Sequence, residues 1–388
     1  MIMAASIRTR LYGPAGVLAL GLLASGCTTM GLEVDATPGV PAFRTAAQFD
    51  ESGLPGVDDF LAVDDAMRAY ARDELAPIAG PRERVRRLAA DLIAPDGPRA
   101  VRYAEGRTHT AGEVFHLREG NCLSFTALVV QLARLSGLEA HFQDVPVLPQ
   151  WHVEGGTFVV ERHVDAVIPL GEMDGIIDFR PPAAATYTKA RVISDANATA
   201  QYFGNLGVER FTHGDLQGAY HMYRRGLEID PRAPTLWLNL GVVFARNGQW
   251  EDAESTYRTA LSIAPGDLSA LNNLALALEK LGDAQSAARL HKRVERYRLR
   301  NPYYLYWQGE RALVAGDAAG AVERFGEAVR RMPEEADFHF ALARSYLAAG
   351  RAPEAERSLA KALRFAQTDT IRLRYREQFE SLRGSAPT

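Results

Sequence analysis

Residues 118–137 read REGNCLSFTALVVQLARLSG, and this stretch decides how the first half of the chain folds. Gly120-Asn121 interrupts the preceding segment, and Asn121 is a favourable N-cap for a helix that ends at Ser136-Gly137. Apolar residues recur along the helix at helical spacing and predict a buried face: Leu123, Ala127, Val130, Leu132 and Leu135. The pattern places Cys122 in the first turn of a helix that otherwise belongs to the core.

A cysteine at a helix start differs chemically from one in a helix interior. The first turn has unpaired N–H groups and a partial positive charge, which favour a thiolate and are able to hold an oxyanion. The position therefore predicts Cys122 as a nucleophile. The alternative is an inert buried thiol, because cysteine is among the most buried residue types.

Downstream of this helix the hydrophobic period changes to two. Four segments are expected to form one antiparallel sheet on which the helix packs: Leu138–Val145, Thr157–Val160, Val164–Ile168 and Ile176–Phe179. His163 precedes the third strand and Asp178 lies near the end of the fourth. Adjacent strands would bring the imidazole beside the carboxylate. A thiolate needs such a base, and the base needs a group that orients it.

Other histidines compete for the role of base. His152 is the rival of His163, but it follows Pro149-Gln150-Trp151 in an expected loop. His116 and His141 are interpreted as structural. A cysteine with scattered histidines has no metal-ligand spacing, so we expect neither a metal nor a cofactor.

The second half of the chain repeats every 34 residues. Three columns carry the period: small residues at 207, 241, 275, 309 and 343, glycines at 214, 248, 282, 316 and 350, and alanines at 219, 253, 287, 321 and 355. A period of this length indicates helix–turn–helix units. Small residues let two helices approach closely, and the second-column glycine allows the turn between them. Because each unit buries its apolar face on the next, five units predict an all-α solenoid.

These columns are similar to those of the tetratricopeptide repeat family, with five repeats over residues 196–368 and a tail over residues 369–388. The resemblance implies a concave groove that binds a protein or peptide partner. Groove-facing positions hold the following candidates: Asn272, Tyr303, Tyr306 and Phe340. The two tyrosines belong to NPYYLYW (301–307), whose alternative interpretation is packing between repeats.

The first half resembles the transglutaminase-like superfamily of papain-type thiol enzymes. The resemblance rests on G-N-C at a helix start, a strand opening with R-H-V and a strand ending in D-F, roughly within residues 80–185. It implies an α+β domain over residues 45–195. By this resemblance Cys122 is the nucleophile, His163 is the general base and acid, and Asp178 orients His163.

The same resemblance implies further site residues and two competing functions. Gln143 and Trp151 are candidates for the pocket or the oxyanion site. One expectation is a thiol acyl-transfer enzyme or peptidase that acts on amide bonds of a protein or peptide recruited by the repeats. The other is a non-catalytic scaffold that binds protein partners.

The first residues resemble an export signal. Arg8 and Arg10 precede an apolar run, and Leu23-Ala24-Ser25-Gly26-Cys27 resembles the lipobox of bacterial lipoproteins. This resemblance implies a signal over residues 1–27, a lipid on Cys27 that anchors the chain to a membrane, and a flexible tether over residues 28–44. The expected location is extracytoplasmic, on the periplasmic face of the outer membrane. The alternative is a cleaved signal with an incidental cysteine.

Composition adds little about partners. The net charge of −4, with 47% hydrophobic and 24% charged residues, gives no reason to expect nucleic-acid binding. The chain has two cysteines, so a lipid on Cys27 would leave Cys122 without a disulfide partner in its own chain.

Overall fold

The computed structural model describes residues 5–9, 39–45, 49–104, 106–145, 152–154, 157–159, 163–171, 173–179, 190–366 and 369–384. These residues divide into two compact units. The first unit comprises Met1–Leu148 and Glu161–Asp283, and the second comprises Pro149–Val160 and Ala284–Thr388. The first unit thus contains the part of the chain around Cys122, called the cysteine region below, together with the first repeat helices.

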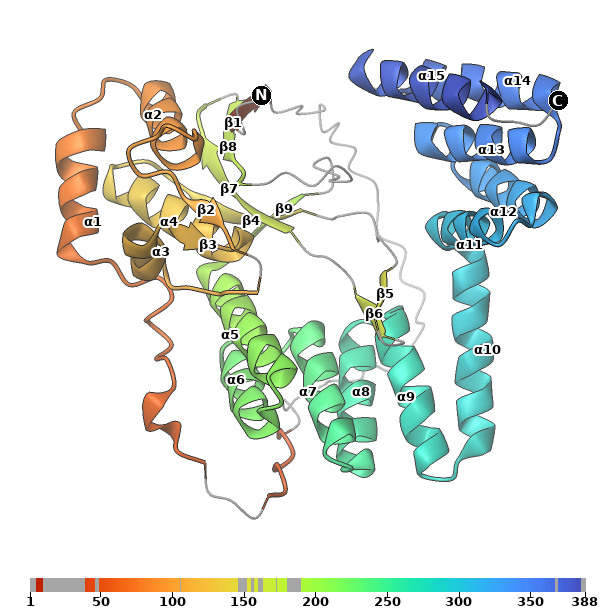
Figure 1. Cartoon of the computed structure of the whole chain (residues 1–388). Helices are drawn as coiled ribbons and strands as arrows, with labels where there is room; N and C mark the ends of the chain where they lie inside the picture. Colours follow the sequence, from red (N-terminus) through yellow and green to blue (C-terminus); the bar gives the residue numbers. More distant parts are fainter. Residues whose placement is uncertain are drawn as a thin grey trace, which may run out of the picture. The chain divides into compact units, whose positions relative to one another are not determined.

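An antiparallel sheet with a helix packed on it forms the cysteine region of the first unit. The strand order is β1 (Ala5–Thr9), β8 (Met173–Ile177), β7 (His163–Pro169), β4 (His141–Val145) and β9 (Arg191–Ile193). Helix α4 (Cys122–Leu135) contacts β7 and β4 (Figure 1). The expected arrangement of this helix on an antiparallel sheet is therefore present.

Short elements surround α4. They are α1 (Asp65–Tyr70), the π-helical turn η2 (Ala71–Leu75), α2 (Pro81–Ile93), α3 (Ala111–Leu117) and β3 (Glu119–Gly120), which pairs with β2 (Arg102–Tyr103). A further short element, η1 (Glu51–Gly53), lies at α6 instead. A capping box starts α3, because Thr110 Oγ1 accepts from the Glu113 N–H while the Glu113 carboxylate accepts from the Thr110 N–H. This fixed start places α3 against α4.

One expected strand does not join the sheet. β6 (Thr157–Val159) pairs with β5 (His152–Glu154) in a separate two-stranded sheet, which belongs to the second unit. The prediction that residues 157–160 share a sheet with residues 164–168 is therefore wrong. Gly155-Gly156 is a two-residue connection of the kind that favours a hairpin, so the two flanking segments pair locally.

The repeats form pairs of helices. In the first unit these are α5 (Asp195–Thr212), α6 (Leu216–Ile229), α7 (Pro234–Arg246), α8 (Trp250–Ile263) and α9 (Leu268–Lys280). In the second unit they are α10 (Ala284–Arg300), α11 (Pro302–Val314), α12 (Ala318–Arg331), α13 (Ala336–Ala348), α14 (Ala352–Phe365) and α15 (Asp369–Gly384). The turn glycines of the second column have positive φ, 82° at Gly214 and 77° at Gly248, as the turn requires.

The small residues of the first column make room for an aromatic ring. A Cβ atom at Gly241 would lie 2.4 Å from Tyr257 Cε1, and one at Gly309 would lie 2.8 Å from Phe325 Cε1. In the last repeat Ala343 stands in this column, and the position 16 residues later, which holds Tyr257 and Phe325 in other repeats, is Leu359. Both residues belong to the same hydrophobic cluster. The close approach of paired helices thus depends on matching a small residue with a large one.

We expect Gly309→Ala and Gly326→Ala to change stability in opposite directions. The added methyl group at Gly309 meets Phe325, so it should lower the free energy of unfolding by about 1–3 kcal/mol. Gly326 lies one position after Phe325, and the nearest atom to a Cβ there is Arg330 Nη1 at 3.8 Å. Alanine should therefore raise the free energy by up to about 1 kcal/mol through helix propensity. Urea unfolding of both variants checks this; equal signs would contradict the packing described.

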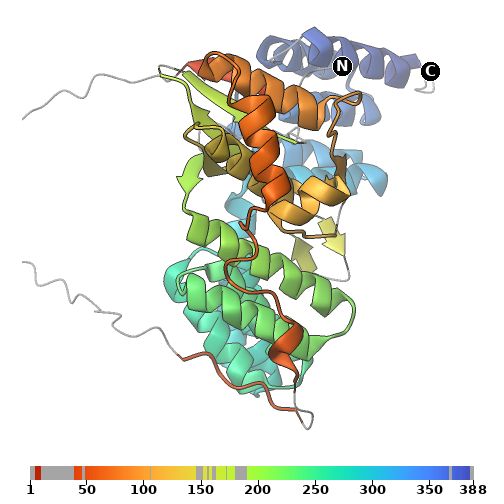
Figure 2. The same ribbon diagram turned by 90° about the vertical axis from the view of Figure 1, so that its left-hand side faces the viewer.

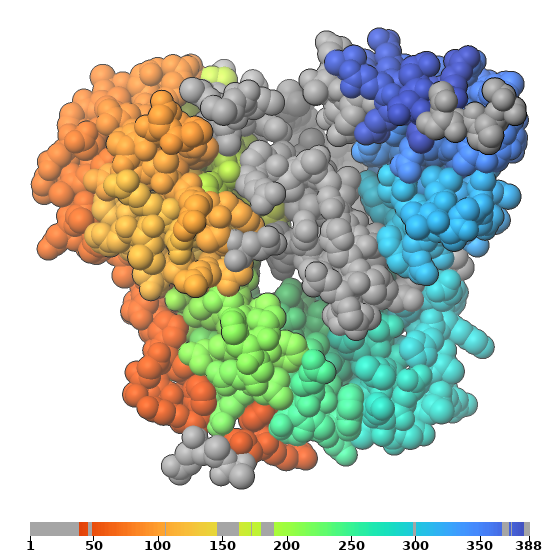
Figure 3. Space-filling model, in the orientation of Figure 1, coloured from red at the N-terminus to blue at the C-terminus, as the bar shows by residue number. Residues whose placement is uncertain are grey.

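An N-terminal strap, defined as residues 39–45 and 49–55, lies along the outer helices of the first repeats. Figure 2 shows it beside the green helices of the first repeat, and in Figure 3 its red-orange atoms lie against their green surface. The Tyr220 hydroxyl donates to the Pro41 carbonyl at 3.1 Å, and Gln249 Nε2 donates to the Ala42 carbonyl at 3.1 Å. Residues 39–44, which we expected in the tether, thus contact α6 and α8.

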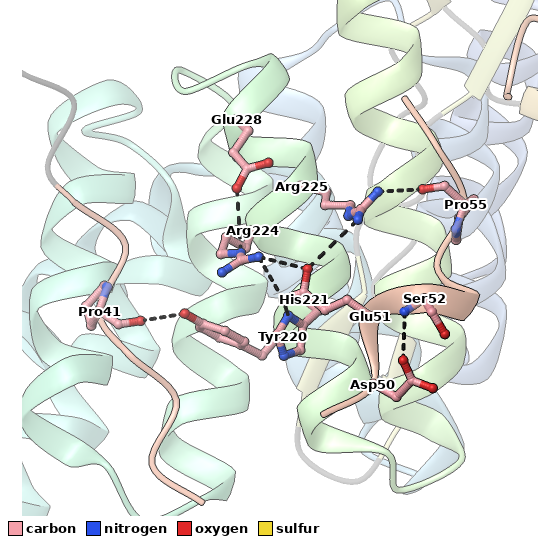
Figure 4. Close-up of polar contacts among 10 residues, drawn as sticks. All are labelled: Pro41, Asp50, Glu51, Ser52, Pro55, Tyr220, His221, Arg224, Arg225 and Glu228. Atoms are coloured by element: carbon pink, nitrogen blue, oxygen red, sulfur yellow. Dashed lines mark hydrogen bonds and ion pairs between the residues drawn. The ribbon is translucent and has the colours of Figure 1, made fainter. Parts of the chain in front are cut away.

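Ion pairs hold the second part of the strap. The Glu51 carboxylate lies 3.0 Å from Arg224 Nη2 and 2.9 Å from His221 Nδ1 (Figure 4). The Phe49 ring stacks on His221 with centroids 4.2 Å apart. Arg225 Nη1 donates to the Pro55 carbonyl at 2.8 Å. The chain therefore reaches the cysteine region along a fixed course on α6.

The cysteine region and the first repeat share one hydrophobic core. Phe60 is fully buried, and its ring stacks on Tyr202 of α5 at 4.7 Å and on Phe142 of β4 at 6.3 Å. Arg134, near the end of α4, pairs with the carboxylate of Asp195 at the start of α5 through two nitrogens, at 2.6 and 2.9 Å. The boundary that we expected after residue 195 falls inside this packed unit.

Candidate functional site

Cys122 is the first residue of α4, as its sequence context predicts. The Asn121 side chain caps the helix by accepting from the Ser124 N–H at 2.9 Å. Ser124 in turn accepts from the His109 N–H at 2.8 Å, which holds the preceding loop against the first turn. The thiol is half-buried and unbonded to another cysteine. It therefore sits beside first-turn N–H groups that lack acceptors within the helix.

His163 and Asp178 form a buried pair next to this thiol. His163 Nε2 lies 2.9 Å from Asp178 Oδ2, and the two residues are 5% and 3% exposed. The Cys122 side chain is close enough to this imidazole to raise its pKa. The three residues that the sequence singled out are therefore together: one at a helix start, one at a strand start and one just after the neighbouring strand.

The environment of His163 favours its protonated form. Burial alone lowers the pKa of the imidazole, but the hydrogen bonds to Asp178 and Cys122 and their charges outweigh burial and raise the pKa to about 10. The imidazole is therefore protonated at neutral pH. An imidazolium in general favours the thiolate form of a neighbouring cysteine.

This raised pKa predicts how stability depends on pH. Because the pKa in the folded chain (about 10) exceeds the unfolded value near 6.5, the stabilisation is fully present below pH 6.5 and is lost as pH rises toward 10. The free energy of unfolding should thus fall between these values. In Asp178→Asn the fall should be smaller, since the first hydrogen-bond partner loses its charge. Urea unfolding of both chains across this range provides the measurement; identical slopes would contradict the ion pair.

Two contacts that the sequence did not reveal position the pair. Thr126 Oγ1 on α4 donates to the Val164 carbonyl on β7 at 3.1 Å, which fixes the helix beside the strand of His163. The Phe179 ring, next to Asp178, stacks on Phe125 of α4 with centroids 4.2 Å apart. Periodicity predicted that these residues are buried, but not which partner each one meets.

Gln143 lies on the sheet face that carries His163. It pairs with Asp165 across β4 and β7, and Asp165 is two residues from His163, so their side chains share a face. Gln143 Oε1 is buried and has no hydrogen-bond partner among the described residues. Asp165 is fully buried and was not recognised from the sequence. Its signal was a carboxylate inside the apolar strand HVDAVIP.

The remaining candidates of this half have different positions. Trp151 and Cys27 lie outside the described residues. His152, expected in a loop, belongs to β5 of the second unit. His116 Nε2 contacts Asp64 at 2.6 Å and His141 Nε2 contacts Glu139 at 2.9 Å, both at the surface.

The groove candidates divide between the two units. Asn272 is half-buried on α9 in the first unit. In the second unit Tyr303 and Tyr306 both pack on the Phe338 ring, with centroids 5.1 and 5.3 Å away. Phe340 is 6% exposed and stacks on Tyr375 of α15 at 4.4 Å. These three aromatic side chains take part in packing between helices.

The described residues contain neither a membrane-spanning helix nor a metal-binding cluster. No described helix combines the length and the apolar character that crossing a membrane requires. The same residues hold no cluster of three or more His, Cys, Asp or Glu side chains that is able to hold a metal ion.

Comparison with known proteins identifies the repeats. Models of the tetratricopeptide repeat family match residues 232–299 and residues 312–375. The chain therefore contains tetratricopeptide repeats, and its C-terminal part is an all-helical solenoid built from them. No curated protein sequence matches the chain.

Solved structures of repeat proteins are also similar. MamA protein is 21% identical, with 43% of this chain and 91% of that chain covered and a TM-score of 0.25. YrrB, described as "a TPR protein with an unusual peptide-binding site", is 19% identical, with coverages of 46% and 92% and a TM-score of 0.25. TTC0263, a thermophilic repeat protein from Thermus thermophilus, is 24% identical, with coverages of 47% and 98% and a TM-score of 0.25.

Proposed function

We propose that the chain is a scaffold whose repeats bind an extended peptide segment of a partner protein. The observation that carries this proposal is a row of aliphatic side chains on adjacent helices. Val208 is 44% exposed on α5, Leu276 is 43% exposed on α9, and Val242 is half-buried on α7 between them. The three stand 34 residues apart, and α7 contacts both α5 and α9.

Two arguments favour a peptide as the occupant of this row. Tetratricopeptide solenoids form extended concave surfaces from the first helix of each repeat, and all three residues lie on first helices. Asn272 lies one helical turn before Leu276, so a backbone-binding amide stands beside an apolar contact. This combination suits a chain that presents both amide groups and apolar side chains.

Leu276→Asp should weaken peptide binding by at least about tenfold, since a charge would replace an apolar contact. The measurement is titration calorimetry on the full chain, with a peptide selected on the wild type from a random display library. Leu373→Asp is the matched control, because Leu373 is 56% exposed on α15, outside the row. Equal affinity of the wild type and Leu276→Asp would refute this binding surface.

We propose, as a second function, that Cys122 performs acyl transfer with His163 and Asp178. The support is the buried His163–Asp178 pair at 2.9 Å beside a half-buried thiol at a helix start. The transglutaminase-like resemblance, roughly within residues 80–185, agrees with these roles. In this proposal Asp178 orients the imidazole, and His163 holds the proton that the leaving group needs.

The proposed reaction has two steps. Cys122 Sγ attacks an amide carbonyl carbon, the C–N bond breaks, and His163 donates its proton to the departing amine. A thioester links the acyl group to Sγ. Water or an amine then attacks this carbonyl while His163 takes a proton, and the Sγ–C bond breaks. Water as acceptor makes the protein a peptidase or amidase, and an amine makes it a transferase.

We further propose that a lipid on Cys27 holds the protein at the periplasmic face of the outer membrane. The support is the lipobox-like sequence Leu23–Cys27. Cleavage before Cys27 would remove β1, the edge strand that pairs with β8. Cys27→Ala should move the protein from the membrane fraction to the soluble fraction of an expressing Gram-negative cell. Unchanged membrane association would rule out this anchor.

A further inference from the structure

A surface pocket lies next to the start of α4. Five residues line it: Arg102, Tyr103, Ala104, Arg107 and Glu119. β2 and β3 run in parallel here, with Tyr103 paired to Gly120, two residues before Cys122. The Tyr103 ring also lies 5.7 Å from the ring of Phe179, the residue after Asp178. The pocket therefore borders residues that adjoin two members of the proposed triad.

One positively charged side chain of the pocket is available to bind a ligand. The Glu119 carboxylate forms an ion pair with Arg102, and its second oxygen lies 3.8 Å from His109 Nε2. Glu119 is thus already neutralised. Arg107 is exposed and pairs with no acidic group in the described part of the chain. Its guanidinium is the cation that remains for a ligand.

The pocket is also joined to the aliphatic row of the repeats. Thr108, next to Arg107, donates its N–H to Glu209 Oε1 at 2.7 Å. Its hydroxyl accepts from Asn121 Nδ2 at 2.9 Å. Glu209 follows Val208 of the row, and Asn121 precedes Cys122. One residue therefore connects the end of the row to the start of the helix that carries the thiol.

We propose that this pocket binds a carboxylate group of the peptide whose amide Cys122 attacks, with Arg107 as the recognising cation. The inference rests on the proposed thiol function and names its substrate class. A guanidinium matches a carboxylate with two parallel hydrogen bonds. The substrate is accordingly an acidic peptide, with an Asp, Glu or terminal carboxylate near the scissile amide and apolar residues on the row.

Two alkylating reagents of unlike charge test this subsite without a known substrate. Iodoacetate and iodoacetamide both alkylate Sγ with loss of iodide, but only iodoacetate carries a carboxylate. The quantity measured is the ratio of their rate constants at Cys122, in the full chain with Cys27→Ser. Arg107→Ala should lower this ratio by about threefold or more, because the positive charge of the proposed carboxylate site is removed. Arg107→Glu should lower it further, and added salt should reduce both differences.

The matched control is Arg82→Ala, which removes an exposed arginine of α2 that does not line the pocket. Its ratio should equal that of the wild type. A ratio that is the same in Arg107→Ala, Arg107→Glu and the wild type would overturn the subsite. The iodoacetamide rate in His163→Ala separates the two proposals. If that rate matches the wild-type rate, the proposed thiol function is wrong and the subsite is wrong with it. If that rate falls but the ratio of the two rate constants does not change when Arg107 is replaced, only the subsite is wrong.

Discussion

Replacing His163 with alanine should slow the alkylation of Cys122 by iodoacetamide at pH 7 by about tenfold or more. The reason is electrostatic. In the proposed acyl-transfer site, the imidazolium, whose pKa hydrogen bonds raise to about 10, is the cation that would stabilise the thiolate. A cysteine without such a neighbour is only a few per cent thiolate at neutral pH. The measurement is the rate of modification across the pH range, in the full chain with Cys27→Ser.

Asp178→Asn and His141→Ala sharpen this test. Asn keeps the shape of Asp178 but loses the charge that holds the imidazolium, so its rate should lie between the wild type and His163→Ala. His141 is at the surface and pairs with Glu139, so His141→Ala should react at the wild-type rate. If Cys122 is alkylated only after unfolding, or at the same rate with and without His163, it is an inert core residue.

Phe60→Ala should lower the free energy of unfolding by about 3–5 kcal/mol, the cost of deleting a fully buried aromatic ring. Phe60 stacks on Tyr202 of the first repeat and on Phe142 of the sheet. The substitution should therefore loosen α4 and α5 together, although they lie in regions with different sequence patterns. Urea unfolding gives the free energy, and hydrogen exchange gives the response of each helix.

Phe60→Leu is the conservative control, and it should cost clearly less because most of the apolar volume remains. If hydrogen exchange quickens in α4 but not in α5, the two regions fold independently and the shared core is not cooperative. If both quicken by similar factors, the first repeat is part of the folding unit that supports the thiol.

Much of the fold could be predicted from local sequence patterns. Asn121 and Gly137 correctly bracketed α4, and the 34-residue columns located the repeat helices. Capping and period are properties of neighbouring residues, so a single sequence exposes them. The column of turn glycines predicted the turns most directly, since only a glycine adopts the positive φ of these turns at little cost.

Long-range partners could not be predicted in the same way. The sequence pointed to Cys122, His163 and Asp178, but nothing local linked Phe60 to Tyr202 or placed the strap on α6. Thr108 shows the reason: its two partners, Asn121 and Glu209, lie 13 and 101 residues away. Such contacts depend on how whole elements pack, which periodicity does not encode.

The most direct test of the account is whether Cys122 forms an acyl-thioenzyme. The full chain with Cys27→Ser is mixed briefly with p-nitrophenyl acetate, an activated ester, and its mass is then measured intact and after digestion. If Cys122 performs acyl transfer, one acetyl group appears on Cys122; hydroxylamine removes it, and His163→Ala fails to form it at a comparable rate. A native chain that stays unmodified, or that is acetylated equally fast without His163, would contradict the account.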